Sequence, residues 1–165
     1  MELQGKKAIV FGGTSGIGLA TTKKLSAEGT DVIALSRDPS KAGQMPANVT
    51  LKQIDVLDES ALASFFEENA PFDILITAAT GGSRSIGPFL EMDLDGYKAS
   101  FAKLWGYAHV VRHGTKHLTQ HGTIVLVSGA PARKCKPGQV SLSSVGGAVE
   151  ALAKAVAPEI APKRI

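Results

Sequence analysis

Short apolar runs alternate along the chain with longer segments whose apolar residues recur at helical spacing. The runs at residues 8–11, 31–35, 49–54, 72–77 and 122–128 are predicted strands, and helices are predicted over 15–28, from 58 through 66, over 94–118 and over 144–160. Strands that are continuously apolar are typical of parallel sheets, because helices cover both faces of such sheets. The pattern therefore predicts a doubly wound, Rossmann-like α/β fold, in a single domain over residues 1–165.

The composition excludes several classes of protein. With 44% hydrophobic and 20% charged residues, the chain is neither disordered nor of low complexity. The 18 Lys and Arg residues are scattered and 5% of residues are aromatic, so we expect no nucleic-acid partner. No apolar run approaches the roughly 18 residues that cross a bilayer, and we expect neither a membrane partner nor a signal peptide. One cysteine, Cys135, cannot form an internal disulfide, which favours a cytoplasmic location.

A glycine-rich turn follows the first predicted strand and opens a helix. It consists of Gly12, Gly13, Thr14, Ser15, Gly16, Ile17 and Gly18. Glycines let backbone N–H groups approach a phosphate closely, and a helix N-terminus supplies unpaired donors. An ordinary tight turn would also use glycine, but the strand before it and the helix after it favour a dinucleotide site. We predict that Gly12, Thr14, Ser15, Gly16, Ile17 and Gly18 bind this cofactor.

The end of the second predicted strand indicates which dinucleotide binds. An acidic residue there would accept a hydrogen bond from the ribose 2′-hydroxyl of NAD, whereas a 2′-phosphate requires a cation. The sequence has Ser36 and Arg37 at this position, which favours NADP(H) as the cofactor. The alternative is a solvated Arg37, or one that pairs with the neighbouring Asp38.

These residues, in this order, resemble the short-chain dehydrogenase/reductase family. The turn matches the TGxxxGxG pattern of that family at Gly12, Gly16 and Gly18, with Phe11 in place of the threonine. Residues 148–162 are similar to the helix that follows the family's active site, so the resemblance covers nearly the whole chain. It implies an oxidoreductase that transfers a hydride between NADP(H) and a small molecule. The reaction would interconvert a carbonyl compound and an alcohol, or reduce an enone.

The resemblance also assigns residues after the third and fourth predicted strands. Asp55 and Val56 match the pair that contacts adenine in the family. Residues 77–80 occupy the place of the family's NNAG motif but keep one of its four residues, and Ala78 and Ala79 are the cofactor-binding candidates there.

The catalytic residues of the family are replaced. Its YxxxK motif falls on Leu142 and Gly146, its serine on Gly129, and its helix asparagine on Lys103. Loss of the family lysine at Gly146 would leave room for the ammonium of Lys103, which could then act as acid, base or electrostatic stabiliser. Ser128, one position before Gly129, is a candidate hydroxyl partner.

Two interpretations of these replacements remain open. In the first, Lys103 and Ser128 form a divergent active site of an oxidoreductase. In the second, Lys103 points to solvent and the protein is a catalytically inactive dinucleotide-binding sensor or scaffold.

Other polar residues carry weaker signals. His109, His113, His117 and His121 recur every four residues, but the stripe rotates around the helix and no acidic residue completes a site, so we expect no metal. The basic loop at residues 133–138 either attracts an anionic substrate or is simply solvated.

The length of the chain and its long helices suggest features beyond this domain. The resemblance implies that the helices at 94–118 and 144–160 form the interface of a homodimer or homotetramer, and core packing is the alternative explanation of their apolar residues. The chain ends at residue 165, where the family's sixth strand should begin. We therefore expect a chain that is truncated there and whose fifth strand is an exposed apolar edge.

Overall fold

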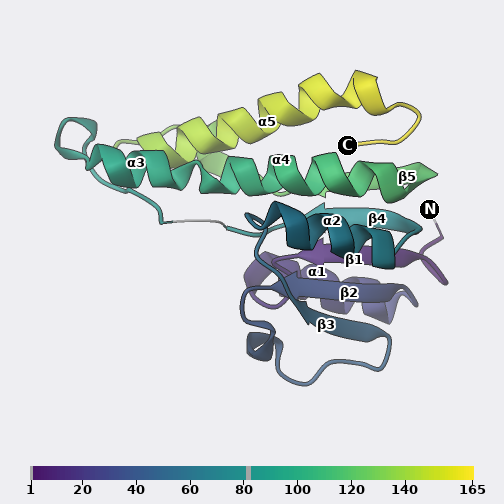
Figure 1. Cartoon of the computed structure of the whole chain (residues 1–165). Coiled ribbons are helices and arrows are strands. Elements are labelled where there is room, and N and C mark those ends of the chain that lie inside the picture. Colours follow the sequence, from purple (N-terminus) through teal and green to yellow (C-terminus); the bar gives the residue numbers. More distant parts are fainter. Residues whose placement is uncertain (1, 81–82) are drawn as a thin grey trace.

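The computed structural model describes residues 2–80 and 83–165, and within them a parallel sheet has the strand order β3-β2-β1-β4-β5. The strands are β1 (Lys7–Phe11), β2 (Asp31–Ser36), β3 (Val49–Gln53), β4 (Phe72–Thr77) and β5 (Leu118–Leu126). The helices are α1 (Gly16–Ala27), α2 (Glu59–Glu68), α3 (Leu94–Ser100), α4 (Ala102–Gly114) and α5 (Val140–Ile160), with short 3-10 turns η1 (Pro39–Ala42), η2 (Phe89–Glu91), η3 (Thr115–His117) and η4 (Ala130–Ala132). The predicted doubly wound α/β fold is confirmed (Figure 1).

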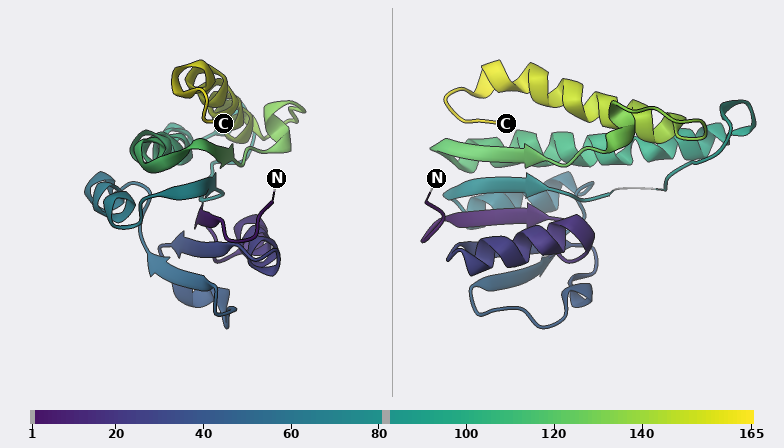
Figure 2. Two further views of the ribbon diagram at one scale, coloured as in Figure 1. Left: turned by 90° about the vertical axis from the view of Figure 1, so that its right-hand side faces the viewer. Right: turned by 180° about the vertical axis from the view of Figure 1, so that it is seen from behind.

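The core lies on both faces of the sheet. The helices α2 and α4 cover one face of the sheet and α1 covers the other (Figure 2). In β1, Ile9 and Phe11 belong to the core on the side of α2 and α4, whereas Ala8 and Val10 belong to the core on the side of α1. All four side chains are at most 1% exposed. The first run is therefore continuously apolar because successive side chains enter two different cores.

The long helix predicted over 94–118 is divided in the structure. α3 ends at Ser100, Phe101 separates the two helices, and α4 ends at Gly114. β5 then begins at Leu118, four residues before the prediction, because the buried Leu118 pairs with Phe72 of β4. The polar residues that follow Leu118 lie where the register between β4 and β5 shifts, which is why their pattern did not predict a strand.

The outer edge of β5 is paired in part. Arg164 N donates to Gly122 O at 3.0 Å, and Ile124 N donates to Arg164 O at 2.7 Å, which makes a parallel bridge beside β5. This is the place of the sixth strand in the order 3-2-1-4-5-6. The expectation of an uncovered edge is therefore wrong at residues 122–124, although Val125 remains 43% exposed.

The helix α5 differs from the expectation that no segment could cross a bilayer. Over an 18-residue window its mean hydropathy is 1.3, so its length and composition would suffice. The sequence pattern did not indicate this because Gly, Ser, Glu150 and Lys154 interrupt the apolar residues of the helix. In the fold, Val145 and Val149 of α5 are buried and the helix packs against α4 and η4.

Candidate functional site

A cavity of about 550 Å³ opens at the carboxyl ends of β1, β2, β4 and β5. Strand order reverses at β1, since β2 continues the sheet on one side and β4 on the other. Crevices at such a switch point are where open α/β sheets bind ligands. Every residue predicted to bind the cofactor or act in catalysis lines this cavity: Gly12, Thr14, Ser15, Gly16, Ile17, Gly18, Ser36, Arg37, Asp55, Val56, Ala78, Ala79, Lys103 and Ser128.

The glycine-rich turn is packed so tightly that Gly12, Gly13 and Gly18 leave no room for a side chain. Gly12 has φ +75°, and a Cβ atom there would lie 2.6 Å from the backbone nitrogen of Ala79. A Cβ on Gly18 would overlap the carbonyl oxygen of Gly12. The turn is tied to β2, because Gly12 N donates to Leu35 O at 2.7 Å. The glycines therefore hold the first turn of α1 directly against the ends of β1 and β4.

The N-terminus of α1 is suited to a phosphate group. Ser15 is the N-cap, but its side chain accepts no capping hydrogen bond, and the first turn of α1 holds no acidic residue. The first backbone N–H groups of a helix have no intrahelical acceptor. Because Ser15, Gly16 and Ile17 line the cavity, these donors and the helix dipole fit an anion there.

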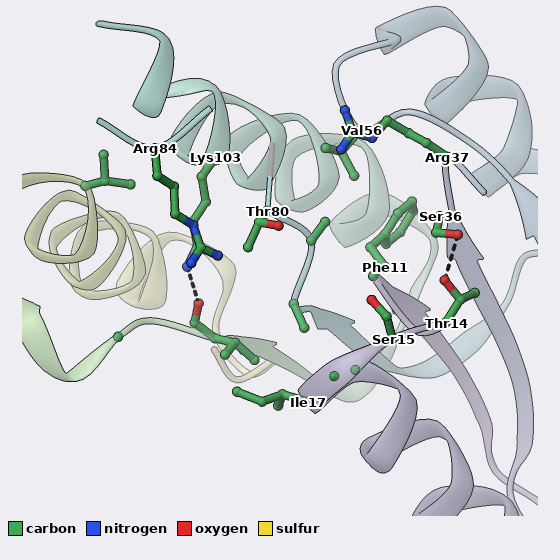
Figure 3. A pocket seen from close by; sticks show the side chains of 18 of the residues that line it. Phe11, Thr14, Ser15, Ile17, Ser36, Arg37, Val56, Thr80, Arg84 and Lys103 are labelled. Atoms are coloured by element: carbon green, nitrogen blue, oxygen red, sulfur yellow. Dashed lines mark hydrogen bonds between the residues drawn. The ribbon is translucent and has the colours of Figure 1, made fainter. Parts of the chain in front are cut away.

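The end of β2 presents a cation to the same cavity. Thr14 Oγ1 donates to Ser36 Oγ at 2.8 Å, which joins the glycine turn to β2 (Figure 3). Arg37 follows, and Asp38 does not pair with it: Asp38 accepts a hydrogen bond from Ser40 and lies 3.6 Å from Lys41 Nζ. The Ser40 hydroxyl lowers the pKa of Asp38. Among the described residues Arg37 has no salt bridge, so its charge is available to a ligand.

The side of the cavity after β3 is formed by Asp55 and Val56. The carboxylate of Asp55 accepts a hydrogen bond from Leu57 N at 3.0 Å, which fixes the turn after β3. Val56 is 7% exposed, and Gly106 of α4 packs so closely on it that a Cβ would lie 2.5 Å from Val56 Cγ2. The contact between Gly106 of α4 and Val56 thus sets the position of this side of the cavity.

At the other end of the cavity, a backbone carbonyl holds two side chains of α4. Lys103 Nζ donates to Val127 O at 2.9 Å, and Tyr107 OH donates to the same oxygen at 3.0 Å. The ammonium also lies 5.2 Å from the centre of the Tyr107 ring. Burial, and then the charge of Arg84, lower the pKa of Lys103, whereas burial raises the pKa of Tyr107. Burial therefore makes the ammonium of Lys103 a stronger acid than usual and the hydroxyl of Tyr107 a weaker one.

That Lys103 uses space left by a glycine at position 146 stays a prediction: both residues line the cavity, and the ammonium donates to Val127 O. A Cβ on Gly146 would lie 2.8 Å from Ala132 Cβ and 3.3 Å from Ser128 Oγ, so the space directly beside the Gly146 Cα is filled. Ser128 Oγ donates instead to Gly146 O at 3.1 Å. The backbone of α5 packs closely against η4 at Gly146. The ammonium of Lys103 donates its hydrogen bond to Val127 O, just after the end of β5.

Several residues that line the cavity were not predicted from the sequence. Arg84 and Thr80 lie on the connection between β4 and α3 and both line the cavity. In Figure 3, Arg84 and Lys103 lie together on the side opposite Ser36 and Arg37. No motif marks Arg84, because its neighbour Lys103 lies on a helix that is distant in sequence.

The remaining polar candidates lie outside the cavity. His113 Nε2 lies 3.0 Å from Glu59 Oε1 of α2, an acidic neighbour that the spacing of the histidines did not predict. The described residues include no group of three side chains that could hold a metal ion. In the basic loop, Arg133 pairs with Glu150 at 3.0 Å, and Cys135 is exposed.

Comparison with known proteins shows a family match over nearly the whole chain. The model of the short chain dehydrogenase family matches residues 6–165. L-xylulose reductase of Bos taurus is 27% identical over 172 residues, which cover 100% of this chain and 70% of the relative.

Solved structures agree with the sequence comparison. A small-chain dehydrogenase in complex with NADPH is 30% identical with a TM-score of 0.80, over 97% of this chain and 67% of that one. A short chain dehydrogenase/reductase family protein, also 30% identical, gives a TM-score of 0.86 over 97% of this chain and 70% of its own.

Proposed function

The chain belongs to the short-chain dehydrogenase/reductase family, and on that premise we propose that it is an NADP(H)-dependent oxidoreductase with a divergent active site. The reaction is hydride transfer between NADP(H) and a small carbonyl compound or alcohol. One observation carries the proposal: a half-buried lysine ammonium, fixed on Val127 O, shares a cavity with a glycine turn suited to phosphate.

The residues at one end of the cavity suit the cofactor. The N–H groups of residues 15–17 would bind the pyrophosphate, Arg37 the 2′-phosphate, and Asp55 with Val56 the adenosine. Ala78 and Ala79 border the same space where β4 ends. When bound, NADPH supplies a hydride to the carbonyl carbon of the substrate and is left as NADP⁺.

Lys103 supplies the proton that the reduction requires. A carbonyl oxygen that becomes an alkoxide needs one proton to form the alcohol, and the lowered pKa of Lys103 makes its ammonium a stronger acid than that of a solvated lysine. The bond to Val127 O fixes the nitrogen in the cavity. After the transfer, burial stabilises the neutral amine, and solvent returns the proton. Ser128 is the next residue after Val127. If its hydroxyl gives up the hydrogen bond to Gly146 O, it can donate a hydrogen bond to the substrate oxygen instead.

One feature favours a second candidate function, a catalytically inactive dinucleotide-binding sensor or scaffold. Leu142 and Gly146, at the positions of the family's tyrosine and lysine, both line the cavity. Neither side chain can donate a proton, so the cavity depends on Lys103 for acid catalysis. A protein that only senses the cofactor does not need that lysine.

The experiment compares the wild type with Lys103→Met, and Lys136→Met is the control because it removes one exposed charge outside the cavity. NADPH binding is measured by cofactor fluorescence, and NADPH oxidation is then followed with a panel of aldehydes and ketones. We expect all three proteins to bind NADPH and Lys103→Met to lose turnover by about 10²- to 10⁴-fold.

Two results would contradict the proposal. Tight binding by the wild type without turnover of any compound would assign the sensor function. Full turnover by Lys103→Met would remove Lys103 from the mechanism.

We also propose a homodimer or homotetramer in the cytoplasm, built from a single domain over residues 1–165. Trp105 of α4 supports this assembly because its large side chain is 62% exposed. Light scattering of the purified protein tests it, and a monomer mass at micromolar concentration would contradict it.

A further inference from the structure

The backbone next to Arg84 is held in place, although the side chain of Arg84 is exposed. Ser85 N donates to Ser100 Oγ of α3 at 3.2 Å, and Ser141 Oγ of α5 donates to Ser85 O. Farther along the same connection, Gly87 N donates to Gly138 O at 3.0 Å. The backbone that carries Arg84 is thus bound to three other segments, and the guanidinium reaches the cavity from a fixed origin (Figure 3).

Arg84 and Lys103 make this end of the cavity positive. Among the described lining residues the carboxylates are Asp38 and Asp55, which belong to the strand ends β2 and β3. Asp38 is engaged by Ser40 and Lys41, and Asp55 by a backbone N–H group. No salt bridge within the described residues involves Arg84 or Lys103. Two neighbouring cations without a counter-ion favour an anionic ligand between or beside them.

The cofactor does not account for this charge. Its phosphates have their own donors at the N-terminus of α1 and at Arg37, and Figure 3 shows Ser36 and Arg37 on the opposite side of the cavity from Arg84. The positive end coincides with Lys103 and Ser128, the residues that face the reacting carbonyl in the proposed function.

We propose that Arg84 determines substrate specificity by binding the carboxylate of an oxo acid whose carbonyl group is reduced beside Lys103. This inference rests on the proposed function and adds the class of substrate. A guanidinium binds a carboxylate through two parallel hydrogen bonds, so Arg84 would also orient the substrate. Lys103 then remains bonded to Val127 O and available to the carbonyl oxygen.

The test measures binding apart from turnover. Protein saturated with NADP⁺ is titrated by calorimetry with 2-oxobutanoate, 3-oxobutanoate and 4-oxopentanoate, which differ in the spacing of the two groups, and with their methyl esters. Saturation with NADP⁺ occupies the phosphate sites, so further anion binding reports a second site. We expect at least one acid to bind about tenfold more tightly than its ester, because Arg84 is partly screened by solvent.

Variants locate the site. Arg84→Met should abolish the preference for the acid and keep NADPH affinity, and Arg84→Lys should restore part of the preference. Lys136→Met, which removes a charge from the basic loop, should keep it. Equal affinity for acids and esters in the wild type, or a preference that survives in Arg84→Met, would overturn the inference. Turnover of neutral ketones with no acid preference would leave the proposed function standing and refute the role of Arg84.

Discussion

Arg37 offers a direct test of which dinucleotide this chain binds. The residue follows β2, borders the cavity and has no salt bridge among the described residues, because Asp38 is engaged by Ser40 and Lys41. A charge-assisted hydrogen bond contributes about 1.5–3 kcal/mol. Arg37 is exposed, so screening places its contribution near the lower end, which corresponds to about a tenfold change in affinity.

The assay is the dissociation constant of NADPH and of NADH, measured by cofactor fluorescence for the wild type and three variants. Arg37→Met should weaken NADPH binding about tenfold and leave NADH binding unchanged, because NADH lacks the 2′-phosphate. Arg37→Asp should go further and favour NADH, since a carboxylate accepts a hydrogen bond from the 2′-hydroxyl. Lys136→Met should affect neither dinucleotide.

The interaction of Arg37 with the 2′-phosphate should also depend on salt. The NADPH preference of the wild type should shrink as salt rises, because exposed charges are screened within about 10 Å at 0.1 M ionic strength. Unchanged NADPH affinity in Arg37→Met, or an equal loss of NADH affinity, would refute the assignment of Arg37 to the 2′-phosphate.

Three further measurements follow from the geometry. Gly18→Ala should abolish NADPH binding, because its Cβ would overlap Gly12 O; retained affinity in calorimetry would contradict this packing. Gly147→Ala has open space around it within α5, so it should keep NADPH affinity and raise the free energy of unfolding by up to about 1 kcal/mol, checked by urea denaturation. The kcat/KM for carbonyl reduction should fall as pH rises through the pKa of Lys103, because only the ammonium donates a proton. That pKa lies below the 10.5 of an ordinary lysine, and a pH profile unchanged up to that value would exclude Lys103 as the acid.

Features set by adjacent residues were predictable from the sequence. The glycine turn needs no distant contact to be recognised, because strand, turn and helix follow one another within residues 7–27. The same holds for Arg37, which lies one residue beyond the end of β2. Continuous apolar strands also predicted the parallel sheet, since both of its faces are buried.

Features that depend on packing between distant segments were not predictable. The division of the long helix at Phe101 and the early start of β5 at Leu118 follow from pairing with β4, which local periodicity does not contain. The place of Lys103 depends on a carbonyl 24 residues away, and Arg84 reaches the same cavity from another connection. Motif spacing identified Lys103 as the unusual residue but did not identify Val127 O as its hydrogen-bond acceptor.

The carbonyl of Val127 explains how the ammonium of Lys103 is held in the cavity. Its position is set by the sheet, because Val127 N donates to Thr77 O at the end of β4 at 3.0 Å. The acceptor for Lys103 is thus backbone and does not depend on the side chains at Leu142 or Gly146. A lysine at position 146 would have to displace Ala132 and would add a third cation beside Lys103 and Arg84. Glycine at position 146 therefore avoids a clash with Ala132 and a further positive charge beside the half-buried Lys103.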